Sequence, residues 1–424
     1  MIETRKQKLQ KNEKIIFWIR VFAGVGAINV VVTLFYLHRG LNLSQIFYLA
    51  IVYSVVTLIF EVPSSYMADK WGRKKTLLVG IVILLLSWLI FFVAHSFFLF
   101  IIGTTFFSIY QACFSGTVEA LLYDSRLELG QKAGSVSSFG KFHSGQRLTK
   151  IFLPILAAFL VQDLLEWQFQ ALIAIDLVAV IIAIILTINL TEANHYMDVE
   201  QSEKGIIKDA WGIIVNNKLL VRTILNKTIL FTASFISWRI YQKFFVDLKV
   251  SVLMIGISIS FLQIITFVFL QKVHYFNSKF SLSKIINISN ILFFLSSLLF
   301  VILMNVSSVK FAYVLLFIYQ AYLFFEMIRA PFFSEIYNKA SFSFNRSTTL
   351  SLVSLLKSIL DIPLLFLAAI MVKFDVNFPF LFLAAIMVKF DVNFPFYITF
   401  VLALIVVLFL RLPKEIDTMN GKTV

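Results

Sequence analysis

The stretch SYMADKWGRKKTL (residues 65–77) connects two long apolar runs, one over 46–67 and the next over 76–94, and includes the end of the first and the start of the second. Each run is long enough to cross a hydrocarbon layer of roughly 30 Å as a helix. Gly72 permits a tight turn, and the guanidinium of Arg73 is a planar fork suited to a carboxylate. The stretch therefore predicts a charged loop that joins two antiparallel membrane helices.

Apolar runs of this kind continue along the whole chain of 424 residues, of which 60% are hydrophobic and 14% charged. A soluble domain has about 25% charged residues, so soluble enzymes, DNA-binding proteins and disordered scaffolds are excluded as interpretations of the whole chain. We predict an all-α integral membrane protein with twelve transmembrane helices. The spans are expected at 15–37, 46–67, 76–94, 97–123, 150–162, 169–190, 228–246, 252–273, 285–304, 309–328, 350–372 and 396–412.

The basic residues predict the orientation of these spans, because Lys and Arg accumulate in short cytoplasmic loops. With both termini in the cytoplasm, most of the 37 basic residues fall in cytoplasmic segments. The external ones are Arg39, Lys243, Lys249, Lys310, Lys373 and Lys389, and those within spans are Arg20, Arg239 and Lys357. The net charge of +14 is thus explained by basic residues that face the anionic lipid of the inner membrane surface, and we expect no nucleic-acid partner.

The spans fall into two groups of six around a polar middle segment. We divide the chain into an N-terminal six-helix bundle over 1–190, a cytoplasmic linker over 191–227 and a C-terminal bundle over 228–424. Apolar residues recur at roughly helical spacing in the linker, which predicts an amphipathic helix on the membrane surface. The sixteen residues LFLAAIMVKFDVNFPF occur twice in tandem over 365–396. We expect the additional copy to lengthen the external loop between the last two spans, or to pack there as a partial helix.

The loop after the second span resembles the signature G-x-L-A-D-r-x-G-r-k-x-x-l of the major facilitator superfamily, with Asp69, Gly72 and Arg73 at the matching positions. A serine replaces the first glycine, and a methionine replaces the leucine. The preceding FEVP (residues 60–63) is similar to a bacterial subgroup that has F-E-x-P before the motif. The resemblance implies two pseudo-symmetric six-helix bundles in a bacterial cytoplasmic membrane.

The resemblance also implies a role for the signature residues. In the family, the arginine pairs with an acid at the cytoplasmic end of the fourth span, where this chain has Asp124. The aspartate of the signature faces span 11 of the other half. We therefore expect Asp69, Gly72, Arg73 and Asp124 to form a conformational latch that favours the outward-open state and breaks when the two halves rock.

Carboxylates inside the spans are candidates for proton coupling, because a charge within a membrane is costly. These candidates are Glu119, Asp176, Glu326 and Asp361. Lys357 lies four residues before Asp361, so an ion pair on one helix face is the alternative for that residue. For the others, pairing with a cation on another span is the alternative. Arg20 and Arg239 are cations for such pairs, and equally ligands for an anionic substrate.

Polar and aromatic residues within the spans predict a substrate site near the midplane between the two halves. The candidates for its lining are Arg20, Asn29, Tyr53, Tyr110, Gln111, Arg239, Gln242, Gln263, Tyr319 and Gln320. Tyr110 and Gln111 on span 4 occupy the place that Tyr319 and Gln320 occupy on span 10.

The family resemblance implies a secondary active transporter that works by alternating access. We expect proton-coupled export of a small amphiphilic or hydrophobic compound. Two motifs of proton-driven drug antiporters are missing, because Pro154 in span 5 has no flanking glycines and span 4 has no arginine motif. The alternative is uptake by symport of a sugar, an organic acid or a peptide. An anionic substrate would need Arg20 or Arg239 facing it.

Other function classes lack the residues that they need. An enzyme would need a cluster of reactive side chains at the membrane surface, and a sensor would need a soluble domain. The one cysteine, five isolated histidines and the absence of a P-loop predict no disulfide, metal, cofactor or ATP-driven step. We expect a monomer whose partners are its small-molecule substrate, protons and the lipid bilayer.

Overall fold

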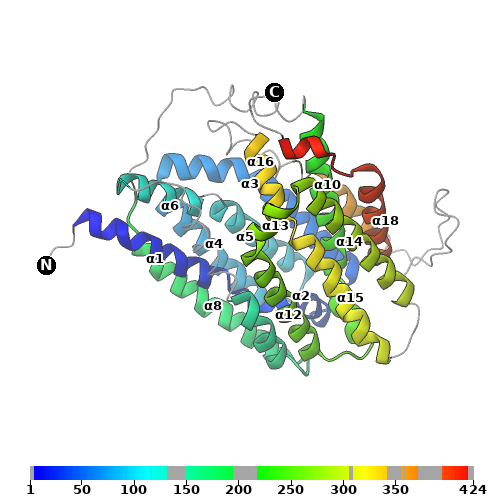
Figure 1. The fold of residues 1–424 in the computed structure, drawn as a ribbon. Helices are drawn as coiled ribbons and strands as arrows, with labels where there is room; N and C mark the ends of the chain where they lie inside the picture. The colour runs from blue at the N-terminus through cyan, green and yellow to red at the C-terminus, as the bar shows by residue number, and fades with distance from the viewer. Residues whose placement is uncertain are drawn as a thin grey trace. The chain divides into compact units, whose positions relative to one another are not determined.

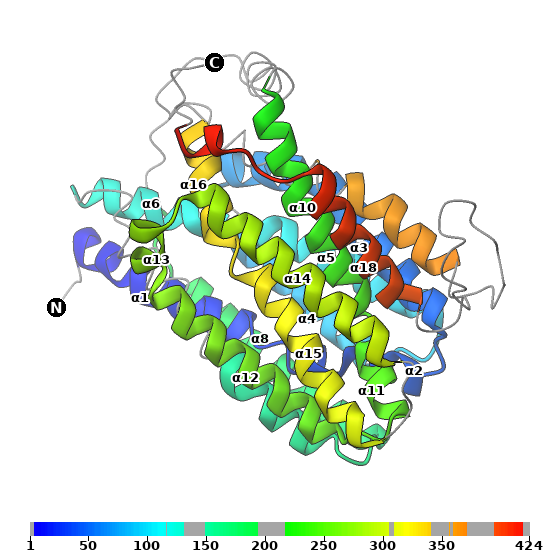
Figure 2. The same cartoon turned by 45° about the vertical axis from the view of Figure 1, so that its right-hand side comes forward.

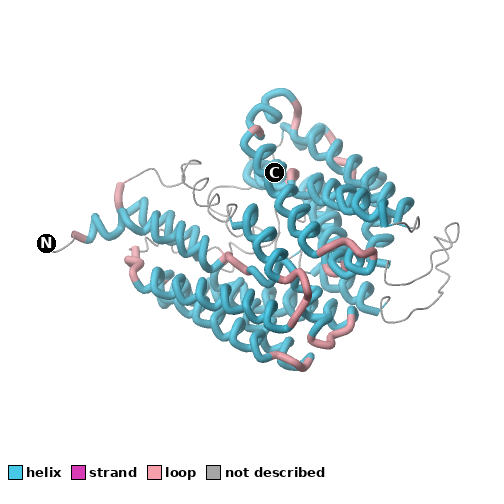
Figure 3. The backbone as a smooth tube through the Cα atoms, turned by 90° about the horizontal axis from the view of Figure 1, so that it is seen from below, coloured by secondary structure: helices cyan, strands magenta, loops and turns pink. Residues whose placement is uncertain are grey.

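The computed structural model describes residues 4–115, 117–130, 149–193, 217–304, 309–340, 356, 359–370 and 394–418, and every regular element in them is a helix (Figure 3). Nine helices in this part of the chain are long and apolar enough to cross a membrane. Shorter apolar helices at Thr149–Leu160, Ile359–Ile370 and Pro395–Phe409 lie where the fifth, eleventh and twelfth spans are expected. The all-α membrane fold is confirmed, and the helices are consistent with twelve spans.

The chain forms two compact units, Met1–Asp198 and Val199–Val424. In the first unit α4 packs against α5 and α8, α3 packs against α5, and α1 runs beside α8 (Figure 1). The helices of this unit are α1 (Arg5–Ala23), the 3-10 helix η1 (Ala27–Val31), α2 (Val32–His38), α3 (Leu43–Trp71), α4 (Arg73–Val93), α5 (Phe97–Phe114), α6 (Thr117–Glu128) and α8 (Glu166–Ile188).

In the second unit α14 packs against α15 and α18, and α10 lies along α18 (Figure 2). The rings of Phe244 and Phe300 meet Phe396 with centroids 4.9 Å and 4.7 Å away. The helices of this unit are α10 (Lys218–Trp238), α11 (Tyr241–Asp247), α12 (Val252–Gln271), α13 (Val273–Lys279), α14 (Leu282–Met304), α15 (Val309–Met327), α16 (Ala330–Ala340), α18 (Phe394–Phe409) and η2 (Lys414–Thr418).

Helix α4 illustrates that a membrane helix has apolar residues on its buried face and on its exposed face. One face is buried against its neighbours and includes Leu77, Ile81, Leu84 and Trp88. The opposite face exposes an apolar stripe made of Val79, Val82, Leu86, Leu89 and Val93. A helix with apolar residues on both faces suits a membrane, where the exposed stripe contacts lipid.

The first and fourth spans of the first unit and the first span of the second unit are interrupted, although each was predicted as one continuous helix. In the first spans, α1 is followed by η1 and α2, and α10 by α11. In the fourth span of the first unit, α5 is followed by α6. The tenth span, predicted at 309–328, is continuous as α15, and the short helix α16 follows it. The helices that precede these short segments have similar lengths in the two units. Helix α1 has 19 residues and α10 has 21, and α5 has 18 residues and α15 has 19. The two units thus share an interrupted first span and helices of similar length.

The predicted start of the seventh span at residue 228 is wrong, because α10 begins at Lys218. Asn217 caps this helix, since its side-chain oxygen accepts a hydrogen bond from the Leu220 N–H at 3.0 Å. The end of the expected linker therefore belongs to a span. The expected amphipathic helix lies almost entirely outside the described residues, as do residues 371–393 of the tandem duplication.

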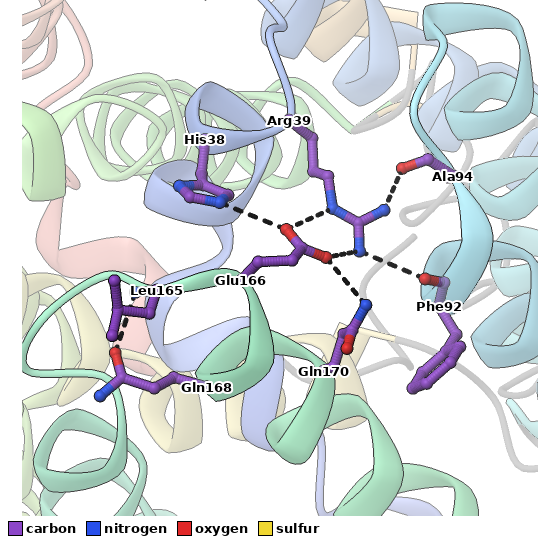
Figure 4. Close-up of polar contacts among 8 residues, drawn as sticks. All are labelled: His38, Arg39, Phe92, Ala94, Leu165, Glu166, Gln168 and Gln170. Atoms are coloured by element: carbon purple, nitrogen blue, oxygen red, sulfur yellow. Dashed lines mark hydrogen bonds and ion pairs between the residues drawn. The ribbon is translucent and has the colours of Figure 1, made fainter.

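Arg39 is buried where the ends of three helices of the first unit meet (Figure 4). Its side chain is 1% exposed. It binds both oxygens of Glu166 on α8, with Nε 3.0 Å from Oε2, and the carbonyl oxygens of Phe92 and Ala94 at the end of α4. His38 Nε2 lies 3.2 Å from the same carboxylate. The guanidinium therefore joins α2, α4 and α8 on the predicted external side.

We predict that Arg39→Lys lowers the free energy of unfolding by roughly 1–3 kcal/mol, because an ammonium group does not reproduce the guanidinium's planar set of hydrogen bonds. Thermal unfolding of the purified protein in detergent measures the loss. Lys243→Ala is the control, since it removes an exposed pair with Asp247 at 2.5 Å that is worth about 0–1 kcal/mol. Equal stability of Arg39→Lys and the parent protein would contradict the assignment.

Candidate functional site

The signature turn needs a glycine for two reasons. Helix α3 ends at Trp71 and α4 begins at Arg73, so one residue makes the whole connection. Gly72 has φ of +96°, which side chains of L-residues rarely adopt. A Cβ added to it would lie 2.9 Å from the Oε2 atom of Glu192. The backbone conformation therefore disfavours a larger residue, and a Cβ at this turn would displace the Glu192 carboxylate.

Glu192 caps the amino terminus of α4. Its carboxylate accepts the backbone N–H of Arg73 at 3.0 Å and that of Lys74 at 2.8 Å. These N–H groups have no partner within the helix, and the helix dipole favours an anion there. The sequence analysis missed Glu192, because it lies 119 residues after Arg73 in a stretch interpreted as linker.

Arg73 forms an ion pair with Asp124 on α6, and both side chains are largely buried. This is the arginine–acid contact that the family resemblance implies, and it lies within the first unit. The backbone of Asp69 is in the last turns of α3, but its side chain is outside the described residues. The role of these residues as a latch therefore stays a prediction.

Further polar contacts join α1, α6 and the segment after α8 near this turn. Asn12 is fully buried and donates to Ser125 Oγ at 2.9 Å and to the Thr191 carbonyl at 2.8 Å. The ion pairs of this cluster are Arg5 with Glu128 at 2.6 Å and Arg126 with Glu13 at 3.0 Å. The signature turn thus belongs to a larger polar cluster at one end of the first unit.

Asp176 supports the interruption of the first span. Its carboxylate is 1% exposed and accepts the backbone N–H of Ala27 at 2.6 Å and that of Ile28 at 3.1 Å. Gly26, just before them, has φ of +55°. These N–H groups open η1 and lack helical partners, so a membrane protein must satisfy them in another way. The sequence analysis found the buried acid and did not foresee its backbone partners.

The other side of the same break contains several predicted lining residues. Tyr110 is buried, and its hydroxyl donates to the Ala23 carbonyl, at the end of α1, over 3.3 Å. Arg20 and Tyr53 interact electrostatically with Tyr110. Asn29 lies in η1 and Gln111 follows Tyr110, and both are half-buried. The structure therefore brings residues from α1, α3 and α5 together at the break.

A cavity of about 230 Å³ lies within the second unit, between α10, α11, α12 and α15. The predicted lining residues Gln263, Tyr319 and Gln320 are part of its wall, as is the coupling candidate Glu326. The rest of the wall is mostly aromatic or aliphatic and consists of Phe231, Ser234, Phe235, Trp238, Tyr241, Ile259, Leu262, Leu323 and Met327.

Two predicted residues lie beside this cavity and outside its lining. Gln242 is fully buried and donates to the Tyr241 hydroxyl at 3.3 Å. The guanidinium of Arg239 lies over the rings of Phe235 and Trp238, 4.4 Å and 5.6 Å from their centroids. Arg239 therefore packs on two rings of the aromatic wall without being part of the lining itself.

Glu326 lies next to a buried cation. Arg329 is 1% exposed, and its Nη2 atom is 3.6 Å from Glu326 Oε1. Its Nη1 atom donates to Asn290 at 2.9 Å and to Asn226 at 3.3 Å. The two asparagines, which come from α10 and α14, were not predicted from the sequence.

The remaining coupling candidates differ in what the structure describes. Asp361 is buried and accepts a hydrogen bond from the Thr232 hydroxyl on α10. Lys357, its expected partner, and the side chain of Glu119 lie outside the described residues. A contact between Lys357 and Asp361 therefore stays a prediction.

We predict that Gly72→Ala is more destabilising than Gly40→Ala. Both glycines have positive φ, but a Cβ at Gly40 has nothing within 4 Å. Backbone strain costs about 1–3 kcal/mol at either position, and only Gly72→Ala adds the contact with Glu192. Thermal unfolding of the two variants measures the difference.

The control is Glu192→Ala alone and combined with Gly72→Ala. Removing the Glu192 side chain should lessen the cost of Gly72→Ala, a coupling of about 0.5–3 kcal/mol in a double-mutant cycle. Additive effects would show that the glycine and the carboxylate act independently.

Comparisons with known proteins agree with this architecture. No curated protein matches the sequence. A mutant of the nucleoside transporter NupG has a TM-score of 0.76 at 14% identity, with 95% of this chain and 98% of that chain covered. The POT family transporter PepTSo has a TM-score of 0.72 at 10% identity, with 97% of this chain and 99% of that chain covered. A D-xylose-proton symporter has a TM-score of 0.70 at 12% identity, with 99% of each chain covered. At these identities the similarity shows a shared fold.

The sequence itself matches the model of one family. That family is described as the Major Facilitator Superfamily, and the match covers residues 17–360. It includes the signature turn, the interrupted first and fourth spans and the cavity of the second unit. This chain therefore belongs to the major facilitator superfamily of membrane transporters.

Proposed function

We propose that the chain exports a small amphiphilic or hydrophobic compound across a bacterial cytoplasmic membrane, driven by proton entry. The observation that carries the proposal is the cavity of the second unit, whose wall is mostly aromatic and aliphatic. Such a wall binds a compound that partitions from water or lipid, because burial of apolar surface supplies the affinity. The distribution of basic residues predicts that both termini lie in the cytoplasm, and the proposal adopts this orientation.

The interrupted spans support transport through a site at helix breaks. In secondary transporters, discontinuous helices bring backbone groups and polar side chains to the substrate and ion sites. Here the break after α10 lies beside Tyr241, and Tyr241 lines the cavity. The break after α1 lies beside Asp176 and Tyr110. Each unit therefore supplies polar groups at a break in its first span.

Asp176 is our first choice for proton coupling. As an anion it is a strong acceptor for the Ala27 and Ile28 N–H groups, and a proton on it would remove that charge. Proton binding would therefore weaken the support of the break in the first span. A conformational change can be linked to a ligand only through such a difference between states. Glu326 is the weaker choice, because Arg329 lies beside it.

Uptake by proton symport is the second candidate. Structures of similar fold include one described as a D-xylose-proton symporter. The cavity argues against an anionic nutrient, because Glu326 is the charged residue in its described lining and Arg239 is not among the lining residues. A neutral nutrient remains compatible with the four polar side chains of Ser234, Gln263, Gln320 and Glu326.

We predict that energised cells expressing the chain extrude a lipophilic dye, and that a protonophore abolishes the extrusion. Asp69→Asn should abolish it through the latch. Asp176→Asn should lower the protonophore-sensitive rate about tenfold or more, the effect of losing roughly 1.4 kcal/mol of a charge-assisted hydrogen bond. Asp247→Asn, which alters an exposed ion pair with Lys243, is the matched control and should leave the rate unchanged.

The direction of transport is tested with proteoliposomes under an imposed proton gradient. Dye movement against the direction of proton flow supports export by antiport. Movement in the same direction as protons would contradict export and favour symport.

A further inference from the structure

The cavity of the second unit contains hydrogen-bonding atoms that the protein leaves unused. Gln320 is 4% exposed, and its amide nitrogen donates to the Ser258 hydroxyl at 2.9 Å. Within the described residues its Oε1 atom has no hydrogen-bond partner, and the same holds for Oγ of Ser234, which is 6% exposed. Because buried polar atoms are usually paired, these two atoms in residues of the cavity wall are available to hydrogen-bond a ligand.

The unused atoms favour a ligand that donates hydrogen bonds. The Gln320 amide is fixed by its bond to Ser258, so the end that remains is a carbonyl oxygen, which only accepts. Ser234 can accept or donate. A ligand with an N–H group at this wall would satisfy Gln320, whereas a carbonyl or carboxylate would face it unfavourably.

The charge of the cavity points the same way. Glu326 is the one charged residue in the described lining. Its carboxylate pairs with Arg329, whose Nη2 atom lies 3.6 Å from Glu326 Oε1, but Arg329 is not part of the wall, so the cavity meets the acidic member of the pair. A carboxylate in a mostly apolar cavity attracts a cation and repels an anion. A protonated amine therefore fits better than an acid.

The aromatic wall selects for shape. Tyr241 and Tyr319 are stacked, with ring centroids 5.0 Å apart and planes 10° apart. Trp238, Phe231 and Phe235 complete the aromatic part of the lining. Tyr241 and Tyr319 are buried, so the half-buried rings of Trp238, Phe231 and Phe235 are the ones that can contact a flat ring system or a cation. The volume of about 230 Å³ lies below the usual range of roughly 300–1,000 Å³, which limits the bound part to one or two rings.

We propose that this cavity binds aromatic amines, with the ring against the aromatic wall, an N–H group donating to Gln320 and the positive charge attracted by Glu326. The inference rests on the proposed transport function and narrows its substrate class. It also makes Gln320 and Glu326 the residues that select an amine over an acid with the same ring.

The test measures equilibrium binding to the purified full-length protein in detergent. Three probes share one ring system: tryptamine carries an amine, indole is neutral, and indole-3-acetate is an acid. Tryptamine should show saturable binding and should be at least about tenfold tighter than indole, the effect of one hydrogen bond to a charged group. Indole-3-acetate should bind most weakly.

Variants assign the selectivity to residues. Glu326→Gln and Gln320→Leu should each weaken tryptamine by about tenfold or more and change indole by less than about threefold. Ser234→Ala is the third lining variant, with an expected smaller loss for tryptamine. Gln162→Leu changes an exposed glutamine of the first unit and is the control, with no change for any probe. Thermal unfolding identifies any lining variant that fails to fold. The binding data of the two remaining lining variants then test the assignment.

The outcomes separate this inference from the proposed function. Equal affinity for tryptamine and indole-3-acetate, no saturable tryptamine binding, or unchanged affinity in folded variants would overturn the inference, even if proton-driven dye efflux is observed. Selective tryptamine binding that depends on Gln320 and Glu326 would support it. In that case, absence of efflux would refute export and leave the substrate class standing.

Discussion

The Asp176 carboxylate accepts the two backbone N–H groups that are freed where the first span breaks, and much of the first unit is arranged around that contact. In hydrocarbon an unsatisfied peptide group costs several kcal/mol. A membrane helix is therefore interrupted only where another helix supplies a partner. Here α8 supplies the acid and α5 supplies Tyr110, which binds the carbonyl on the other side of the break. The half-buried Arg20 and Asn29 flank this supported break.

Both units have a break in the first span but stabilise their polar groups by different means. The first unit uses ion pairs and a carboxylate cap around the signature turn, with Arg73, Asp124 and Glu192 as its main members. The second unit buries Arg329 between Asn226 and Asn290. A buried guanidinium with neutral acceptors needs all of them in place, because each lost partner leaves a donor unpaired. The second unit thus surrounds its buried guanidinium with two amide oxygens and the Glu326 carboxylate, whereas Arg73 at the signature turn pairs with Asp124.

Apolar run length and the signature turn were enough to predict the helical membrane fold and most of the spans. Four predicted residues line the described cavity: Gln263, Tyr319, Gln320 and Glu326. They could be predicted because a polar side chain within an apolar span costs free energy and therefore marks a functional or structural site. The breaks could not be predicted, since apolar residues continue through them. Glu192 and Arg39 were missed for another reason, because their partners are distant in sequence and each was interpreted as an ordinary loop residue.

The buried Arg39 also constrains the order in which the chain assembles. Its carboxylate partner, Glu166, comes 127 residues later. During synthesis the guanidinium therefore reaches the predicted external side long before its counter-ion exists. Until then the partners available to it are the Phe92 and Ala94 carbonyls at the end of the third span. A nascent chain that stalls before residue 166 therefore has the cation in place without the carboxylate that neutralises it.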